Sequence, residues 1–166
     1  MITIKTATEK DIPVIENILT EVVVWLNSIG QPMWREEEAK WPWLSKRFNI
    51  SDFRIAYLNG VPAACMAVID HDPNFWPDVP KGESLFIHKL AVKRFAAKQN
   101  LSDALIDHAK QLCIEQNIPF LRLDTHQLRP KLRAVYERNG FVCVAEKCLF
   151  EKFHTAFYEY KIPTTQ

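Results

Sequence analysis

Apolar residues follow two different periods along this chain, and the two periods separate predicted strands from predicted helices. Short segments that alternate or are continuously apolar are typical of β-strands, whereas repeats at helical spacing are typical of amphipathic helices. The predicted strands are Ile2–Ala7, Phe53–Leu58, Pro62–Ile69, Leu85–Val92, Phe120–Asp124, Phe141–Ala145 and Thr155–Ile162. The predicted helices run from a Thr8 cap to about Asn27, from Leu101 to Asn117 and from Lys131 to Asn139, with a further short helix in the Trp-rich segment after Gly30.

Capping and turn residues mark where these elements begin and end. Thr8 is a good N-cap, and Asp11 three residues later completes a box-like start. Asn59-Gly60 between two apolar runs is a strong signal for a tight hairpin. Asn117 and Gly140 can supply the left-handed backbone that follows a helix. The connections at 70–82 and 125–130 are expected to be irregular.

The order of these elements predicts the fold class. Strands and helices alternate as β-α-α-β-β-β-α-β-α-β-β, which suits an α/β protein with a mixed central sheet and helices on both faces. At 166 residues the chain is large enough to bury a proper core, so we expect one domain over residues 1–166. No internal repeat or linker interrupts it.

Composition and charge narrow the function classes. A net charge of +1 gives no argument for nucleic acid, and no apolar run approaches the roughly 20 residues of a membrane span. The start of the chain lacks a signal-peptide pattern, so we expect a cytoplasmic protein. The four cysteines form no CxxC pair, and Cys65 and Cys113 lie in apolar runs typical of buried, reduced thiols.

The segment from Leu85 to Asn117 has the pattern of an anion-binding unit. An apolar strand enters a short basic loop, and the loop opens a helix whose first N–H groups and positive dipole end point at it. Lys93, Arg94 and Lys98 could hold phosphates as point charges. The alternative is that these three residues are solvated surface cations on a loop that binds nothing.

Tryptophan is concentrated just before and after Gly30, at Trp25, Trp34, Trp41 and Trp43. These side chains either anchor the packing of a short helix or line a pocket for a substrate, because aromatic side chains serve both purposes.

Several motifs taken together carry a family resemblance. Leu90-Ala91-Val92 is followed by the loop and helix, then by Leu121–Asp124, and then by Ala134–Phe141, which contains a Tyr-x-x-x-Gly-Phe signature. The opening residues Ile2–Ile12 also fit. This order resembles the GNAT family of N-acetyltransferases over nearly the whole chain. The resemblance implies a mostly antiparallel sheet of the acyl-CoA N-acyltransferase type, with acetyl-coenzyme A as the acetyl donor.

The resemblance also implies which residues contact acetyl-coenzyme A. In the family a loop motif of Arg or Gln, two residues, Gly, one residue, and Gly or Ala holds the pyrophosphate, and here the matching positions are Ala97, Asn100 and Ser102. Asn tolerates a positive φ better than other non-glycine residues, although Asn100 could instead cap the helix together with Asp103. Arg129 stands where the family often has an Asn that contacts the cofactor arm. The expected cofactor-binding residues are Leu90, Ala91, Val92, Ala97, Lys98, Gln99, Asn100, Leu101, Ser102, Asp103 and Arg129.

Three residues are candidates for the chemistry. The resemblance gives Tyr136 the role of protonating the leaving thiolate; the alternative is a tyrosine that only packs in the core. Glu83 and His88 are candidate bases, and a water chain to solvent could serve instead. Asp124 and His126 lie close together in sequence, but two such residues do not make a metal site, so we expect no metal.

The sequence therefore predicts an N-acetyltransferase that acts on a primary amine of a small molecule or peptide, with a homodimer as a possible assembly. Two alternatives remain open. One is a catalytically weak or inactive binding or regulatory module with the same fold, and the other is an interaction protein that uses the Trp-rich segment as its contact surface.

Overall fold

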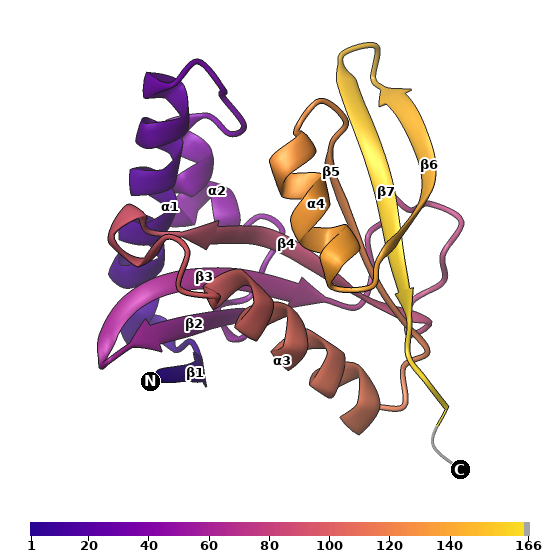
Figure 1. The fold of residues 1–166 in the computed structure, drawn as a ribbon, viewed down its shortest axis with the longest axis horizontal. Helices are drawn as coiled ribbons and strands as arrows, with labels where there is room; N and C mark the ends of the chain where they lie inside the picture. The colour runs from indigo at the N-terminus through magenta and orange to yellow at the C-terminus, as the bar shows by residue number, and fades with distance from the viewer. Residues whose placement is uncertain (165–166) are drawn as a thin grey trace. The chain divides into compact units, whose positions relative to one another are not determined.

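The computed structural model describes residues 1–164, and Figure 1 follows the elements along the chain. The α-helices are α1 (Ile12–Ser28), α2 (Trp41–Leu44), α3 (Leu101–Glu115) and α4 (Pro130–Arg138). Single 3₁₀ turns lie at η1 (Glu9–Asp11), η2 (Glu36–Ala39), η3 (Ile50–Asp52) and η4 (Arg94–Ala96). The strands are β1 (Ile2–Thr6), β2 (Phe53–Leu58), β3 (Val61–Ile69), β4 (Ser84–Val92), β5 (Phe120–His126), β6 (Val142–Leu149) and β7 (Phe153–Lys161).

The strands form a seven-stranded mixed sheet in the order β1-β2-β3-β4-β5-β7-β6. The pairs β1–β2, β2–β3, β5–β7 and β6–β7 are antiparallel, whereas β4 and β5 are parallel. The register of β4 with β5 covers only Ser84–Phe86 opposite Phe120–Arg122, while β5 pairs with β7 over its full length. The expected mixed, mostly antiparallel sheet with flanking helices is therefore confirmed.

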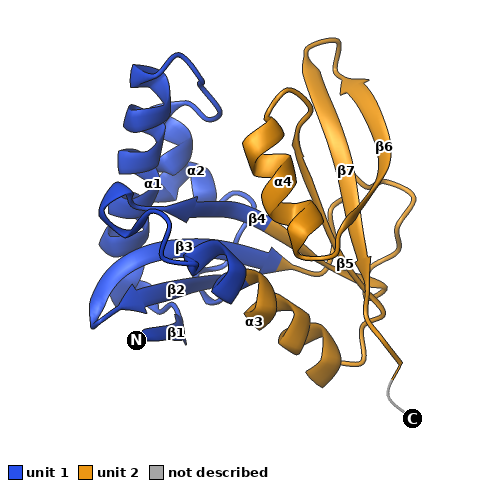
Figure 2. Cartoon of the chain, in the orientation of Figure 1, with its two compact units in different colours: residues 1–68, 88–105 blue, residues 69–87, 106–166 orange. Residues whose placement is uncertain are grey.

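The chain divides into two compact units, which Figure 2 colours separately. Unit 1 contains residues 1–68 and 88–105, and unit 2 contains residues 69–87 and 106–166. The strand β4 and the helix α3 each contribute residues to both units.

Unit 1 is built on the antiparallel strands β1–β3 and on α1. The expected capping box is present, because the Asp11 carboxylate accepts the Thr8 N–H at 2.8 Å. The turn between β2 and β3 is left-handed at both Asn59 (φ 51°) and Gly60 (φ 82°), as the Asn-Gly pair predicts. The core is fully buried and apolar, and includes Ile15, Leu19, Phe53, Ile55 and Met66.

Unit 2 is built on β5–β7 with α4 and the second part of α3. The C-terminus of α3 ends as predicted, with Asn117 left-handed (φ 56°) and the Ile118 N–H donating to Cys113 O at 2.9 Å. Arg122 is 8% exposed, yet its guanidinium donates to Glu159 at 3.2 Å and to the Ser84 hydroxyl, so its buried charge is paired.

Two strands of unit 2 extend beyond their predicted ends. Thr125 and His126 belong to β5, not to the following connection, because β7 pairs with them as well. The penultimate strand continues to Leu149, beyond the predicted end at Ala145. Because β6 lies at the edge of the sheet, most of its residues are exposed, and the missed part begins with the charged residues Glu146 and Lys147. A bulge between Cys143 and Ala145 also breaks the alternation that would mark a strand in the sequence.

The cysteines are free thiols, as expected. Cys65 and Cys113 are fully buried, and burial raises the pKa of each to about 12, so both thiols stay protonated and unreactive at neutral pH. Among the described residues, no helix combines the length and the apolar character needed to cross a membrane.

A matched glycine pair tests the packing of α4 in unit 2. Gly140 and Gly82 have nearly the same left-handed backbone, with φ of 89° and 91°. A Cβ on Gly82 meets nothing within 4 Å, whereas one on Gly140 lies 3.1 Å from the Tyr160 ring, which Lys110 covers at 4.0 Å and Phe141 contacts at 5.7 Å.

We therefore expect Gly82→Ala to lower the free energy of unfolding by about 1–2 kcal/mol, the cost of left-handed backbone alone. Gly140→Ala should cost about 1–3 kcal/mol more, because the ring must shift as well. Urea unfolding of both variants measures the difference, and equal losses would show that Tyr160 is not held in place.

Candidate functional site

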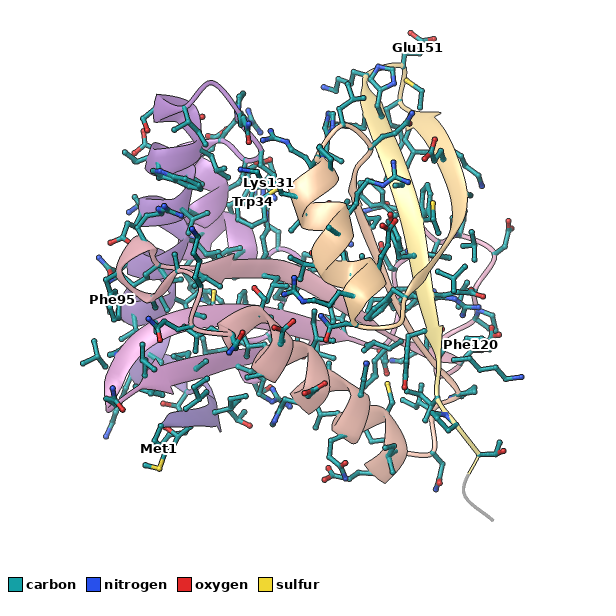
Figure 3. All side chains as sticks on the ribbon, viewed as in Figure 1. Met1, Trp34, Phe95, Phe120, Lys131 and Glu151 are labelled. Carbon is teal, nitrogen blue, oxygen red and sulfur yellow. The ribbon has the colours of Figure 1, made fainter. Side chains whose placement is uncertain are left out.

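The strand β4 changes course at Lys89, which has a left-handed backbone (φ 54°) inside the strand. In a regular strand His88 and Lys89 would point to opposite faces. Here both reach the same stretch of unit 1, residues 29–52, which we call the Trp-rich segment. The His88 ring lies 5.8 Å from the Phe48 ring, and the Lys89 ammonium lies 4.5 Å from the centre of Trp34, which is labelled in Figure 3. Both polar side chains that flank this unusual backbone angle therefore contact residues of the Trp-rich segment.

The contact between His88 and Arg47 favours one of the two neutral tautomers of the His88 ring. An Arg47 terminal nitrogen lies 3.3 Å from His88 Nε2. Because a guanidinium can only donate, this contact is a hydrogen bond in the tautomer that leaves Nε2 as acceptor and carries its proton on Nδ1. His88 would therefore have to release Arg47 before Nε2 could take a proton from a substrate.

The residues Leu90–Val92 complete β4 immediately after this change of course. Ala91 is buried, and Leu90 and Val92 are half-buried. The Lys93 N–H donates to Ala63 O at 2.8 Å, which ties the end of β4 to unit 1. The side chains of Leu90, Ala91 and Val92 are hydrocarbons without acid, base or nucleophile, so any contribution of these residues to a reaction comes from their main-chain amides.

Two of the three predicted phosphate-binding cations contact α1. Lys93 donates to Asn17 at 2.7 Å and lies 3.8 Å from the Glu21 carboxylate. The Arg94 guanidinium stacks on Trp25 at 3.9 Å, and the Arg94 N–H donates to Glu21 at 3.2 Å. These contacts hold η4 against α1, which leaves Lys98, an exposed residue, as the stronger candidate for a phosphate.

The loop before α3 adopts glycine-like backbone without containing glycine. Lys98 (φ 63°) and Asn100 (φ 64°) are both left-handed, which confirms that the backbone at Asn100 reaches a positive φ. A left-handed backbone costs roughly 1–2 kcal/mol in a residue other than Gly or Asn, such as Lys98. Contacts with the surrounding structure must therefore hold the loop in this conformation.

The first turn of α3 directly follows this loop. The Ala104 N–H is the first of the helix to donate to an i−4 carbonyl, that of Asn100 at 3.0 Å, so the N–H groups of residues 101–103 have no acceptor in this i−4 series. Buried Leu101 anchors the turn, Ala97, Ser102 and Asp103 are half-buried, and Gln99 is exposed. The positive end of the helix dipole and Lys98 therefore lie on the same short stretch of chain, which suits an anion.

Tyr136 is one of the predicted residues in unit 2. It lies on α4 with its ring 6.1 Å from Phe141 and 6.0 Å from Tyr158, and it is 5% exposed. Burial and the charge of Asp124 raise its pKa well above the usual range. The hydroxyl consequently stays protonated and can act as a hydrogen-bond or proton donor.

Glu83 and Arg129 also lie in unit 2. The Glu83 carboxylate is 3.9 Å from the guanidinium of buried Arg122, so an ion pair holds this candidate base. Arg129 occupies the N-cap position of α4, where its carbonyl accepts the Arg133 N–H at 2.9 Å. Its half-buried side chain stays a predicted cofactor contact.

Sequence reasoning missed Arg47 and Lys89 as candidate site residues. Arg47 lies in an exposed charged turn with nothing distinctive around it. Lys89 gives one weak signal, since it is a charged residue inside an otherwise apolar strand. The backbone of Lys89 is left-handed where the side chain contacts Trp34, and a lysine in the sequence gives no indication of such a backbone.

Comparison with known proteins identifies what the chain is similar to. Residues 20–141 match the model of the acetyltransferase (GNAT) family. Comparison with curated protein sequences found no match.

Solved structures give the same fold. A GNAT-family acetyltransferase from Listeria monocytogenes superposes with a TM-score of 0.78 at 22% identity, over 96% of this chain and 94% of that one. The ribosomal-protein-S18-alanine N-acetyltransferase of Escherichia coli has a TM-score of 0.73 at 16% identity, over 100% and 97%. The PaiA N-acetyltransferase of Thermoplasma acidophilum, solved with coenzyme A, has a TM-score of 0.70 at 14% identity, over 97% and 99%. At these identities the likeness shows the fold.

The proton position on His88 is a testable consequence of its contact with Arg47. Two-bond ¹⁵N–¹H NMR spectra should show the neutral ring protonated on Nδ1 in the wild type. Arg47→Met should return the ring to the Nε2-protonated form that free imidazole prefers in water. Lys46→Met is the control, because Lys46 lies over Trp43 at 4.9 Å and should leave His88 unchanged. An Nε2-protonated wild type would contradict the assigned hydrogen bond.

Proposed function

Because the chain belongs to the acetyltransferase (GNAT) family, we propose that it transfers the acetyl group of acetyl-coenzyme A to a primary amine. The proposal also treats residues 1–166 as one acetyltransferase domain, since the matched residues 20–141 draw on both compact units. Coenzyme A in the PaiA structure supports this choice of donor.

The reaction sets three demands on the protein. The nitrogen of a neutral amine attacks the thioester carbonyl carbon, the C–S bond breaks, and the sulfur leaves with the bonding electrons. The oxygen gains negative charge during attack, the nitrogen must lose a proton, and the thiolate is helped by gaining one. Donors, a base and an acid are therefore needed.

The observation that carries the proposal is the left-handed backbone of Lys98 and Asn100. Phosphate loops use glycine because the main chain must approach oxygen atoms closely in unusual conformations. This loop reaches such conformations with other residues and leads straight into the first turn of α3. We assign the pyrophosphate to Lys98 and to the N–H groups of residues 101–103, with Ala97, Gln99 and Asn100 shaping the turn.

The remaining roles follow the family resemblance. Main-chain amides of Leu90–Val92 would polarise the thioester carbonyl, and Arg129 would contact the arm of the donor. Protonated Tyr136 would supply the proton to sulfur, which agrees with its raised pKa. Glu83 and His88 stay candidate bases, although each is held by an arginine, Arg122 and Arg47 respectively.

The loop assignment predicts different effects for two neighbouring cations. Lys98→Met should raise the Kd for coenzyme A about tenfold and weaken its salt dependence, since one phosphate contact is lost. Arg94→Met should leave Kd within about twofold and lower the melting temperature, because Arg94 stacks on Trp25 at 3.9 Å. Calorimetric titration at two salt concentrations measures both, and an unchanged Kd for Lys98→Met would remove the assignment.

The acid assignment predicts a loss of rate without a loss of fold. Tyr136→Phe keeps the ring and its contacts with Phe141 and Tyr158. Turnover should fall by about 10²–10⁴, with KM for acetyl-coenzyme A little changed. Thiol release over a panel of amines provides the assay.

The same assay separates the enzyme from a binding module. Wild-type protein that binds coenzyme A but releases no thiol with any amine would favour the module. A Tyr136→Phe variant that turns over at the wild-type rate would show that the proton comes from elsewhere.

A further inference from the structure

We propose that Tyr158 is a positioning residue for Tyr136, because it holds the helix α4 in the place from which the Tyr136 hydroxyl can give its proton to sulfur. The inference rests on the proposed acetyltransferase function and adds to it a residue that acts on the reaction only through Tyr136. Both residues belong to unit 2, Tyr136 on α4 and Tyr158 on β7.

The helix α4 has little apolar surface with which to anchor itself. It is nine residues long, and of these residues only Tyr136 is buried. An isolated helix of this length is marginal in water, and helices in proteins gain most of their stability from the packing of an apolar face. Polar contacts therefore have to fix where α4 lies, and with it the Tyr136 hydroxyl.

The Tyr158 side chain supports both the Tyr136 ring and the helix. The centres of the two rings are 6.0 Å apart. The Tyr158 hydroxyl accepts the Arg133 Nε–H at 2.7 Å and donates to the Glu137 carboxylate at 2.8 Å. Arg133 and Glu137 are four residues apart and so lie on successive turns of one face of α4. A single hydroxyl thus ties two turns of the helix to β7.

The protonation state of Tyr158 suits this bridge. Burial raises the pKa of Tyr158 above its ordinary value and outweighs the opposing hydrogen bond from Arg133. The hydrogen bond to Glu137 acts in the same direction as burial. The hydroxyl therefore keeps its proton at neutral pH and continues to donate to Glu137.

Arg133 uses all three nitrogens of its guanidinium to join α4 to the rest of unit 2. Besides the contact of Nε with Tyr158, Nη1 donates to Gln127 O at 3.0 Å. Nη2 donates to the Glu146 carboxylate at 2.7 Å and to the Cys143 sulfur at 3.6 Å. Hydrogen bonds with a charged partner are stronger than neutral ones, and a fully bonded network fixes its members in one arrangement. The Tyr158 hydroxyl is consequently held in one position.

A bulge in β6 brings the Glu146 carboxylate to this guanidinium. Cys143 and Glu146 are three residues apart and would point to opposite faces of a regular strand. The bulge between Cys143 and Ala145 shifts the alternation, so that Cys143 lies opposite Tyr158 and Glu146 lies opposite Ala156. Tyr158 and Ala156 are two residues apart and share one face of β7. The irregularity in the edge strand thus completes the network on the face that α4 contacts.

The position of the acid decides how much it contributes to the rate. Proton transfer requires heavy atoms within about 2.6–3.2 Å, and a displacement of roughly 1 Å can lower a rate about 10²-fold. Loss of the Tyr158 hydroxyl releases two turns of α4 from β7 while the rings of Tyr158 and Tyr136 remain. It should therefore slow the step that uses Tyr136 and have little effect on the binding of the acetyl donor.

Tyr158→Phe tests this directly, because it removes the bridging oxygen and keeps the ring beside Tyr136. We expect kcat for thiol release to fall about tenfold or more, with KM for acetyl-coenzyme A changed less than about threefold. Tyr160→Phe is the matched control on the same strand, since the Tyr160 ring contacts Lys110 and Phe141, which lie outside the network. It should leave both values within about twofold.

A double-mutant cycle separates positioning from a general loss of structure. If Tyr158 acts through Tyr136, adding Tyr158→Phe to Tyr136→Phe should leave kcat within about twofold of that of Tyr136→Phe alone. A merely structural effect would instead lower kcat by the same factor in both backgrounds. Equal factors, or an unchanged kcat for Tyr158→Phe, overturn the inference.

Glu137 offers variants that leave the core intact, because its side chain is exposed. Glu137→Ala removes the acceptor of the Tyr158 hydroxyl and should also lower kcat. Glu137→Gln keeps a carbonyl oxygen as acceptor and should restore most of the lost rate. A normal kcat for Glu137→Ala, or a loss that Glu137→Gln does not rescue, contradicts the bridge.

Fluorine NMR decides the inference if no amine releases thiol and the proposed function fails. The chain has four tyrosines, so protein labelled with 3-fluorotyrosine should give four signals, and the signal lost in Tyr136→Phe belongs to Tyr136. Tyr158→Phe and Glu137→Ala should shift or broaden this signal, whereas Tyr160→Phe should not. A Tyr136 signal that ignores Tyr158→Phe overturns the inference, and a signal that responds supports it even if the enzyme proposal has failed.

Discussion

The left-handed backbone of Lys89 is the constraint that shapes unit 1 around the end of β4. Without it, His88 and Lys89 would alternate across the strand; with it, both reach the Trp-rich segment between α1 and β2. The unusual angle costs roughly 1–2 kcal/mol in a residue other than glycine or asparagine. Its own contacts offset this cost, because the Lys89 carbonyl accepts the Cys65 thiol at 3.7 Å and the ammonium packs on Trp34. The main-chain amides proposed to polarise the thioester come directly after this interruption.

The same solution appears again in the loop before α3, where Lys98 and Asn100 adopt positive φ in place of the glycines usual for phosphate loops. What stabilises this loop is its attachment to α1 through Lys93 and Arg94. Lys93 and Arg94 thus stabilise the conformation of the loop, while Lys98 is the cation proposed to bind the phosphate. In unit 2, burial of Tyr136 has a comparable effect, since it keeps the hydroxyl protonated and so suited to donate.

The fold was largely predictable from local signals, and the site only in part. Helical periodicity located α1 and α3, and Asn59-Gly60 located the β2–β3 hairpin, because these signals lie within each element. The edge strand β6 was predicted too short because Glu146 and Lys147 are charged and exposed and a bulge precedes them, so the alternation of apolar residues stops before the strand does. The residue type of Asn100 allowed a positive φ without requiring it, whereas nothing in the sequence pointed to a positive φ at Lys98 or Lys89, because lysine rarely adopts it. The contacts of Lys93 and Arg94 with α1 join residues far apart in sequence, which no local pattern reveals.

The central claim is that a loop without glycine holds the acetyl donor through its main chain. An amide NMR titration of the ¹⁵N-labelled protein with coenzyme A tests it most directly, since it follows each N–H separately. The account predicts saturable shifts at residues 98–103, with a common Kd, that are large compared with those of the β2–β3 turn at Asn59 and Gly60. Saturable binding that leaves residues 98–103 unshifted, or no binding at all, would contradict it.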